Sequence, residues 1–295
     1  MTAPLDNLIE TGCVDFSYGA CCGSGRDRKA LDGVSLRIGK GEHVAIAGGN
    51  GSGKTTFARL LNALLLPTGG TVCIGGTDTS DKERLWEIRR IVGMVFQDPD
   101  SQIVGTTVAE DVAFGPANLG LEPEEMRRRV RRALRDVGMG DFAGAAPHLL
   151  SGGLKQKVSM AGVLAMKPAC VILDEATAKL DPIARKEIMD VLRLRNREEG
   201  VTVLHITHDM EEAALADRVI VLDAGKVALD GNPREVFSQA TRLKSLGMDV
   251  PQVTELFDLL REEGMDLPSG VLDVEEAAAI LTRSITGRGY AFHTS

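Results

Sequence analysis

The chain has 295 residues, of which 43% are hydrophobic and 26% charged, an ordinary composition for a globular protein with a full core. Its formal net charge of -8 and its aromatic content of 4% disfavour a general nucleic-acid binder, because such proteins need basic surfaces and aromatic side chains for stacking. No apolar run approaches the ~20 residues of a membrane span, and the N-terminal residues lack the basic and apolar regions of a secretory signal.

The cysteines favour a reducing, cytoplasmic compartment. The chain has five of them, an odd number, and none forms a CxxC pair, so neither a zinc ribbon nor a disulfide framework is indicated. Cys170 opens an apolar run and is expected to pack as a small hydrophobic side chain. Cys21 and Cys22 precede a Gly-Ser-Gly segment, and we interpret residues 21–25 as a flexible surface loop.

A phosphate-binding loop is indicated by the sequence GGNGSGKTT at residues 48–56. It follows a short apolar run at residues 44–47 and precedes a helical pattern that continues to Leu66 and stops at Pro67. A match to G-x-x-x-x-G-K-[ST] between a strand and a helix directs backbone N–H groups and the positive helix end toward phosphate oxygens. The predicted nucleotide-binding residues are Gly48, Gly49, Asn50, Gly51, Ser52, Gly53, Lys54, Thr55 and Thr56.

Two side chains of this loop have specific predicted tasks. Lys54 is expected to reach the β- and γ-phosphates of a nucleoside triphosphate, and the Thr55 hydroxyl to ligate Mg²⁺. The competing interpretation is a Gly-rich turn that contains Lys-Thr by coincidence. The strand before the loop and the helix after it disfavour that interpretation.

Further short apolar runs predict buried strands of a mostly parallel sheet, because they are bounded by turn residues and separated by helical stretches. These runs cover residues 91–96, 171–173, 201–206 and 219–222. Together with the phosphate loop, the pattern is typical of an α/β fold of the P-loop NTPase type.

Between Gln97 and Ser151 the strand pattern is absent, so we predict a helical subdomain at about residues 98–165, inserted into the sheet domain. Within it, the helix expected at residues 124–135 carries one apolar stripe made of Met126, Val130, Leu134 and Val137. Its six arginines are compatible with a nucleic-acid patch, but we favour a solvated face paired with the acidic residues Glu122, Glu124 and Glu125.

Two further elements suit phosphate chemistry. The apolar strand at residues 171–173 ends in Asp174, which is placed to hold Mg²⁺ through water, and Glu175, which is placed to polarise the attacking water. An acidic helix cap is the alternative interpretation. The sequence Ser151-Gly152-Gly153 precedes a helix predicted at residues 154–166 and has the form of an anion-binding helix start, although a simple cap also fits.

The C-terminal part has a different, helical pattern. We divide the chain into a main domain at residues 1–230 and a helical extension at residues 231–295, which is a small domain or a dimerisation element. Residues at helical spacing in the extension are Val253, Leu256, Phe257 and Leu260, and residues 271–281 form a second predicted helix. Nothing in the extension indicates chemistry.

The chain resembles the ATP-binding-cassette ATPases, because residues 150–153 are similar to their signature motif. The resemblance implies that Ser151, Gly152 and Gly153 close over ATP held by another subunit. It also implies that Tyr18 stacks on adenine and that Gln97 senses Mg²⁺, the attacking water and the membrane partner. Two further residues follow from the resemblance: Asp181 lies in the loop that crosses the dimer interface, and His208 contacts the γ-phosphate. His205 is expected to be structural.

Longer matches cover nearly the whole chain and narrow the resemblance to ATPases of energy-coupling-factor and cobalt importers. They lie at residues 97–104, 108–116, 161–166 and 233–237. Ala176 and Thr177 after Glu175 are closer to the first of the two paired ATPases of this class. The resemblance implies a peripheral subunit on the cytoplasmic face of the cell membrane that hydrolyses ATP with Mg²⁺ to import vitamins or transition-metal ions. Its implied partners are a second ATPase, related or identical, a transmembrane coupling protein and a substrate-capture membrane protein.

Three departures from the family pattern affect this expectation. Gly49 stands where the family commonly has Pro, Leu154 replaces a Gln, and Ala178 replaces a Ser. Because the apolar Leu154 cannot hydrogen-bond a nucleotide or a neighbouring loop, the site built with this signature is expected to be weaker. Glu175 and His208 are present, so we expect hydrolysis at this chain's own phosphate loop. Two alternatives stay open: a DNA-repair or translation ATPase of the same fold, and a regulatory module that holds ATP without turnover.

Overall fold

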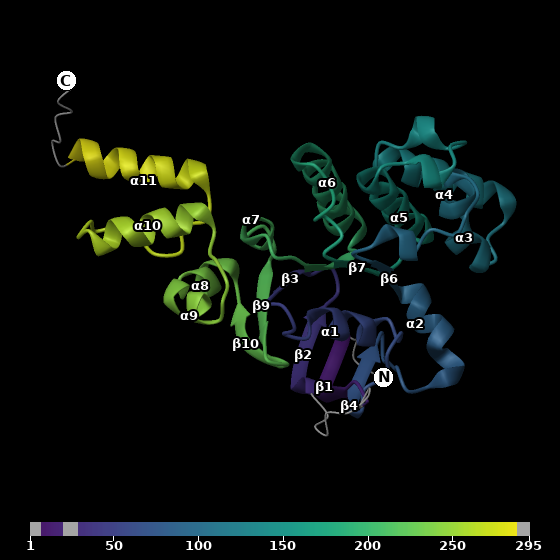
Figure 1. Ribbon diagram of the computed structural model, residues 1–295, viewed down its shortest axis with the longest axis horizontal. Coiled ribbons are helices and arrows are strands. Elements are labelled where there is room, and N and C mark those ends of the chain that lie inside the picture. The colour runs from purple at the N-terminus through teal and green to yellow at the C-terminus, as the bar shows by residue number, and fades with distance from the viewer. Residues whose placement is uncertain (1–6, 20–28, 288–295) are drawn as a thin grey trace.

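The computed structural model describes residues 7–19 and 29–287 (Figure 1). The segment with Cys21 and Cys22 lies outside the described residues. The strands are β1 (Asn7–Ser17), β2 (Lys29–Gly39), β3 (His43–Ala47), β4 (Gly69–Ile74), β5 (Thr77–Asp78), β6 (Val92–Val95), β7 (Cys170–Asp174), β8 (Thr202–Ile206), β9 (Arg218–Asp223) and β10 (Lys226–Gly231). The α-helices are α1 (Lys54–Leu61), α2 (Leu85–Ile91), α3 (Val108–Asn118), α4 (Pro123–Asp136), α5 (Gly152–Met166), α6 (Pro182–Glu199), α7 (Met210–Ala213), α8 (Pro233–Phe237), α9 (Ala240–Ser245), α10 (Gln252–Glu262) and α11 (Val274–Gly287).

The central element is a six-stranded sheet of order β10-β9-β3-β8-β7-β6, in which every pair of neighbours is parallel except β9 and β10. The predicted strands and the mostly parallel sheet are confirmed. Side chains alternate between two buried faces: Val44 and Ile46 join one hydrophobic cluster, and Ala45 and Ala47 join another. Because both faces are covered, strands β3, β6, β7, β8 and β9 are nearly continuous apolar runs, which made them visible in the sequence, whereas the edge strand β10 is only partly buried.

The strand order decides where the candidate site lies. Strands β3, β8, β7 and β6 are successive neighbours and parallel, so the loops that follow them leave the same edge of the sheet. These four loops carry the phosphate loop, His208, Glu175 and Gln97, respectively. Residues far apart in sequence are therefore brought to one edge.

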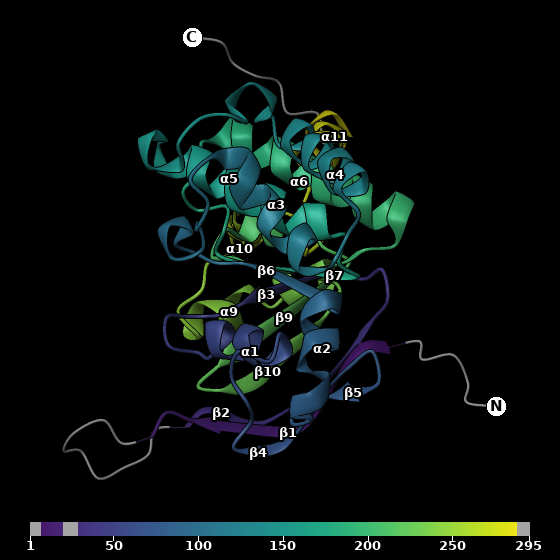
Figure 2. The same ribbon diagram turned by 90° about the vertical axis from the view of Figure 1, so that its right-hand side faces the viewer.

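A second, antiparallel sheet of order β2-β1-β4-β5, which was not predicted from the sequence, lies below the first in Figure 2. Its strands are less regular than those of the main sheet, because β1 has register shifts on both sides and Gly33 interrupts β2 with a φ of 70°. Helix α1 packs between the two sheets: Phe57 shares one buried cluster with Ile38 of β2 and Ile46 of β3. The antiparallel sheet thus packs against the side of α1 that faces away from the main sheet.

Helix α1 ends at Leu61, so the predicted helical continuation to Leu66 is wrong. Asn62 caps the helix, and Ala63 adopts a left-handed φ of 53°. The amides of the next two leucines donate to the Arg59 carbonyl at 2.9 and 3.0 Å, which closes the last turn. The leucines continue the apolar pattern beyond the point where the backbone has already turned.

Helices α3, α4 and α5 lie above the main sheet, in the region predicted to be helical (Figure 2). The predicted stripe on α4 is confirmed, since Val130, Leu134 and Val137 are buried and Met126 packs against the same cluster. Arginines of α4 pair with Glu124 and Glu125 as predicted, but the described residues contain no ion pair to Glu122, and Glu199 of α6 is a partner that was not predicted. The pairs are Arg127–Glu124, Arg128–Glu125, Arg129–Glu125 and Arg132–Glu199.

The C-terminal helices lie at the far end of the molecule from α3 and α4 (Figure 1). Helices α10 and α11 share their own hydrophobic cluster, built around Phe257, Leu267, Val271 and Ala277. Leu256 is 45% exposed and lies off the buried stripe, and α11 begins at Val274 rather than at residue 271. The division at residue 230 stays a prediction. Within residues 7–19 and 29–287, no helix combines the length and the apolar character that crossing a bilayer requires.

Candidate functional site

The phosphate loop connects β3 to α1, and its backbone requires glycine at two positions. Gly48 has a φ of 151°, and a Cβ there would lie 2.3 Å from the carbonyl oxygen of Leu222. Gly53 has a φ of 105°, and a Cβ there would lie 2.5 Å from the carbonyl oxygen of Ala30. A side chain at either position would displace the backbone of a neighbouring strand or loop. The loop therefore follows a path that only glycine permits.

Lys54 is buried at the start of α1, and its ammonium points back into the loop. Its Nζ donates to the carbonyl oxygens of Gly48 and Gly49 at 2.8 and 3.0 Å. Burial lowers the pKa of Lys54, while the nearby carboxylates of Glu175 and Asp174 act in the opposite direction. Both present acceptors are neutral, so an anionic phosphate oxygen would be a stronger partner for this ammonium.

Thr55 and Asp174 meet at the head of α1, although they come from different parts of the chain. The Thr55 hydroxyl donates to the Asp174 carboxylate at 2.9 Å. Burial raises the pKa of Asp174, a hydrogen bond from Thr55 lowers it, and the neighbouring Glu175 raises it further, with a net increase.

This pair of oxygen donors suits Mg²⁺, which is commonly held by one or two protein oxygens together with water and substrate phosphates. Such binding does not need a metal site made entirely of protein ligands. In the described part of the chain, no group of three or more His, Cys, Asp or Glu side chains is placed to hold a metal ion. The donor set therefore fits the predicted role of Thr55 and Asp174.

Glu175 joins three loops of the sheet edge. Its carboxylate accepts a hydrogen bond from Gln97 Nε2 at 3.0 Å and lies 2.5 Å from His208 Nε2. Its amide donates to the carbonyl of Ile206 at 3.0 Å, and its backbone has a φ of 52°, a left-handed conformation that is uncommon for a residue with a side chain. Of the predicted catalytic residues, Glu175 therefore contacts both Gln97 and His208.

The hollow beside the phosphate loop has a volume of about 560 Å³. Tyr18 stands at its side, half exposed, with its hydroxyl 3.0 Å from Thr56 Oγ1 and its ring edge-on to Phe16. This position leaves an aromatic face available for stacking. The residues that line this hollow are Tyr18, Lys29, Ala30, residues 50–56, Gln97 and Glu175. His208 lines an adjoining hollow of about 520 Å³, which shares Glu175 with the first.

Lys29 and Ala30 belong to β2 and were not anticipated as part of this hollow. They adjoin the phosphate loop because the antiparallel sheet lies beneath α1, and that sheet was not predicted. No local motif marks either residue.

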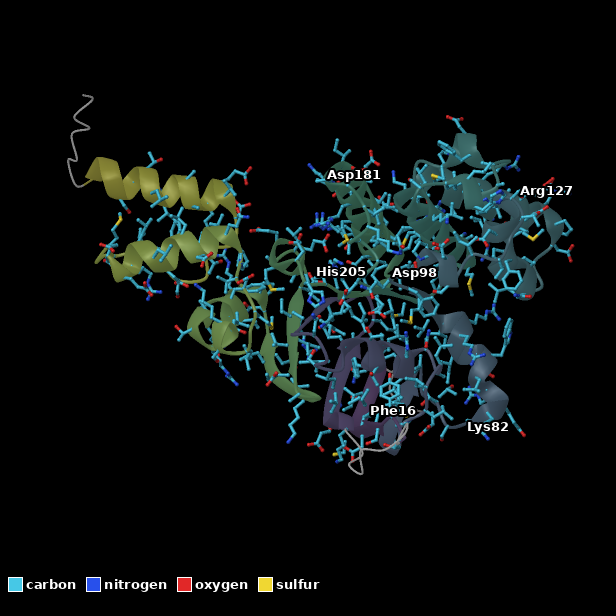
Figure 3. The ribbon with its side chains drawn as sticks, in the orientation of Figure 1. Phe16, Lys82, Asp98, Arg127, Asp181 and His205 are labelled. Atoms are coloured by element: carbon cyan, nitrogen blue, oxygen red, sulfur yellow. The ribbon has the colours of Figure 1, made fainter. Side chains whose placement is uncertain are left out.

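Two predicted binding segments lie outside this hollow. Ser151 caps α5, accepting from the Leu154 amide at 3.4 Å, and it is exposed together with Gly152. Asp181 caps α6, accepting from the amides of Ile183 and Ala184 at 3.0 and 2.9 Å, and is also exposed (Figure 3). Within one chain, these residues serve as helix caps and do not line the hollow that contains Lys54.

Comparison with known proteins identifies close relatives. The ABC transporter family matches residues 31–178. The chain is 54% identical over 272 residues to the energy-coupling factor transporter ATP-binding protein EcfA1 of Clostridioides difficile. The aligned region covers 92% of this chain and 97% of that protein. It is 49% identical over 249 residues to the protein of the same name from Bacillus subtilis, covering 84% and 88% of the two chains.

Solved structures give the same result. CbiO1 from Clostridium perfringens, described as part of the ABC transporter complex cbiONQ, matches with a TM-score of 0.71 and 35% identity over 86% of this chain and 99% of that one. The ATP-binding cassette MJ0796, solved as a dimer in a post-hydrolysis state with ADP and phosphate, matches with a TM-score of 0.70 and 33% identity. That match covers 76% of this chain and 98% of the cassette.

Proposed function

The chain belongs to the ABC transporter ATPases, and among them to the energy-coupling factor ATP-binding proteins; from this premise we propose that it hydrolyses ATP to energise a membrane importer of vitamins or transition-metal ions. The observation that carries the proposal is the Glu175 carboxylate, held between Gln97 and His208 at the edge of the phosphate-loop hollow. A carboxylate in that place is suited to polarise a water molecule beside a bound γ-phosphate.

In the proposed reaction, the glycine-rich backbone and Lys54 hold the β- and γ-phosphates while Tyr18 stacks on the adenine. Thr55 and Asp174 are the residues that would hold Mg²⁺, which supplies positive charge to the triphosphate oxygens when bound. Glu175 accepts a hydrogen bond from the attacking water. His208 and Gln97 fix the direction of that carboxylate, and His208 lies where it can also contact the γ-phosphate.

The exposed segments at the starts of α5 and α6 are proposed to complete the site of a second ATPase, related or identical. Ser151, Gly152 and Gly153 would close over the partner's ATP, and Asp181 would lie in the contact between the two chains. The dimeric form of a solved relative supports this arrangement. ATP then holds two cassettes together, and hydrolysis removes the bridging phosphate so that they separate.

The membrane partners are proposed from the names of the relatives. A transmembrane coupling protein beside Gln97 would convert closure of the ATPase pair into alternating access, and a substrate-capture membrane protein would supply the imported compound. The chain would then be a peripheral subunit on the cytoplasmic face of the membrane. The relatives' descriptions as transporter ATP-binding proteins, and as part of a transporter complex, support this assembly.

Affinity purification from detergent-solubilised membranes tests the proposal. We expect the tagged chain to retain a second ATPase and at least one polytopic membrane protein, and the purified complex to close on addition of Mg-ATP, as measured by cross-linking across the pair. Recovery of the chain without membrane proteins, or equal cross-linking with and without nucleotide, would contradict the transport assignment.

A further inference from the structure

Behind the contact between Glu175 and His208 lies a buried polar cluster that the proposed reaction does not use. We call it the Glu212 cluster; it comprises Thr177, Arg185, His205, Thr207 and Glu212. All of its members except Arg185 are buried, and His205, its most enclosed member, lies in the middle of the molecule (Figure 3). Because buried polar groups need hydrogen-bond partners, the contacts within this cluster constrain the positions of the segments that carry it.

One carboxylate oxygen is the centre of this cluster. Glu212 Oε2 accepts hydrogen bonds from the hydroxyls of Thr207 at 2.8 Å and Thr177 at 3.0 Å, and it lies 3.1 Å from His205 Nε2. Its other oxygen, Oε1, faces Arg185 Nε at 3.4 Å. A single side chain of the short helix α7 thereby holds donors from three other segments.

The hydrogen bonds of the cluster favour an ionised Glu212. Burial by itself raises the pKa of this carboxyl, but hydrogen bonds from His205, Thr207 and Thr177 together hold the pKa below its usual range. As a carboxylate, Glu212 is only an acceptor, which matches the two hydroxyls and the imidazole nitrogen that surround its Oε2. An amide that keeps its oxygen at the Oε2 position turns its NH₂ group toward Arg185, a cation that can donate hydrogen bonds but cannot accept one.

The two threonines lie next to the reacting pair along the chain. Thr177 is two residues after Glu175, and Thr207 directly precedes His208. Thr207 Oγ1 also accepts from the amide of Asp209 at 3.0 Å, so the backbone is fixed on both sides of His208. The loop after β7 and the loop after β8 are thus tied to one carboxylate behind the site, and Glu175 and His208 meet in front of it.

We propose that Glu212 is a positioning residue for ATP hydrolysis, which sets the contact between Glu175 and His208 by holding Thr177 and Thr207 at a fixed separation. This inference rests on the proposed function and adds a residue that touches neither nucleotide nor water. The hydrogen bonds and ion pairs of the cluster's side chains involve none of residues 48–56. Loss of Glu212 therefore changes turnover and leaves nucleotide affinity nearly intact. Displacement of a catalytic group by about 1 Å is enough to lower the rate by about 10²-fold.

The test uses the full-length chain in its purified membrane complex. For Glu212→Gln we expect kcat to fall by about ten-fold or more with the KM for ATP changed by less than about two-fold. Thr207→Val, which replaces the hydroxyl with a methyl group of similar size, is expected to lower kcat by a smaller factor. The double variant should be no slower than Glu212→Gln alone, because both changes break the same connection. Glu211→Gln is the matched control, since it removes an exposed carboxylate one residue away on the same helix, and it should leave kcat unchanged.

The outcomes separate this inference from the proposed function. A normal kcat in Glu212→Gln overturns the inference, and so does a loss that appears only as lowered thermal stability or as a raised KM. If Glu212→Gln does not fold, Thr207→Val and Thr177→Val decide, and normal kcat in both overturns the inference. An inactive wild-type complex would instead contradict the proposed function, whereas loss of turnover in Glu175→Gln combined with normal turnover in Glu212→Gln would leave that function intact.

Discussion

His208 Nε2 lies 2.5 Å from Glu175 Oε1, and the opposite oxygen of the same carboxylate accepts from Gln97 Nε2 at 3.0 Å. The three residues follow three parallel strands, β8, β7 and β6, which are consecutive in the sheet. The carboxylate is thereby held from two sides, so that its direction is set by the sheet edge rather than by its own loop alone.

Replacing Glu175 with Gln should retain ATP binding and reduce turnover by about 10²–10⁴-fold, because the amide keeps the shape but is a poor proton acceptor. Steady-state hydrolysis and equilibrium binding of ATP measure the two effects separately. Glu124→Gln, which changes an exposed carboxylate on α4, serves as the control. Unchanged hydrolysis in Glu175→Gln would remove Glu175 from its proposed role.

Removal of Mg²⁺ by a chelator should abolish turnover, and Thr55→Ala should raise the Mg²⁺ concentration needed for half-maximal activity. The reason is that Thr55 and Asp174 contribute a hydroxyl and a carboxylate oxygen to one place, 2.9 Å apart. Titration of activity with Mg²⁺ at saturating ATP measures the shift. Thr55→Ser keeps the hydroxyl and should behave like the wild type, whereas equal metal requirements in the Ala and Ser variants would argue against this ligand.

Leu154→Gln should increase turnover of the assembled complex by a few-fold, if the signature at the start of α5 completes the partner's site. Leu154 is partly buried against the core of the helical region, so some loss of stability is expected in parallel. Leu154→Ala is the control, since it shortens the side chain without supplying a hydrogen-bonding group. The idea fails if both variants change the rate equally.

Acidification should destabilise the fold partly through His43. Burial, reinforced by the nearby His205, lowers the pKa of His43 from 6.5 to about 4, and its Nε2 has no hydrogen-bond partner. Between these values the unfolded chain binds a proton that the folded chain excludes, so stability falls as the pH drops from 6.5 to 4, by about 3 kcal/mol in total. Above pH 6.5 His43 is neutral in both the folded and the unfolded chain, so this loss of stability is absent.

Calorimetric melting temperatures across this pH range test the His43 prediction. His43→Gln, which cannot be protonated, should show a shallower decrease of melting temperature than the wild type. The exposed His148→Gln should leave the slope unchanged. Identical slopes in the wild type and His43→Gln would show that the acid sensitivity arises elsewhere.

Phe257→Ala should destabilise the tail helices selectively. Phe257 is completely buried in the cluster shared by α10 and α11, and deleting such a ring typically costs about 3–5 kcal/mol. Hydrogen exchange should show faster opening of α10 and α11, while ATP binding persists. The neighbouring Leu256→Ala, at a position 45% exposed, should have a smaller effect. A uniform loss of protection throughout the chain would argue against a separate tail unit.

Several features of the fold escaped the sequence because their signals are weak or non-local. The antiparallel sheet is built from strands with bulges and an interrupting glycine, so its alternation of apolar residues is broken, and Lys29 could not be assigned to the hollow. Helix α1 ends at Leu61 although leucines continue, because Ala63 turns left-handed and packing overrides propensity. Glu212 has the ordinary position of an acid in the first turn of a helix, and nothing nearby in sequence marks it as buried.

The sequence by itself determined the local motifs, because each of them consists of residues that are adjacent in the chain. The glycines and lysine of residues 48–55, and the carboxylates at the end of β7, can be recognised locally, because backbone conformation and strand periodicity depend on consecutive residues. The contacts of Glu175 with Gln97 and His208, and of Glu212 with Thr177 and Thr207, were decided only by the tertiary structure. They depend on which parallel strands become neighbours, and strand order is set by packing between segments that are distant in the chain.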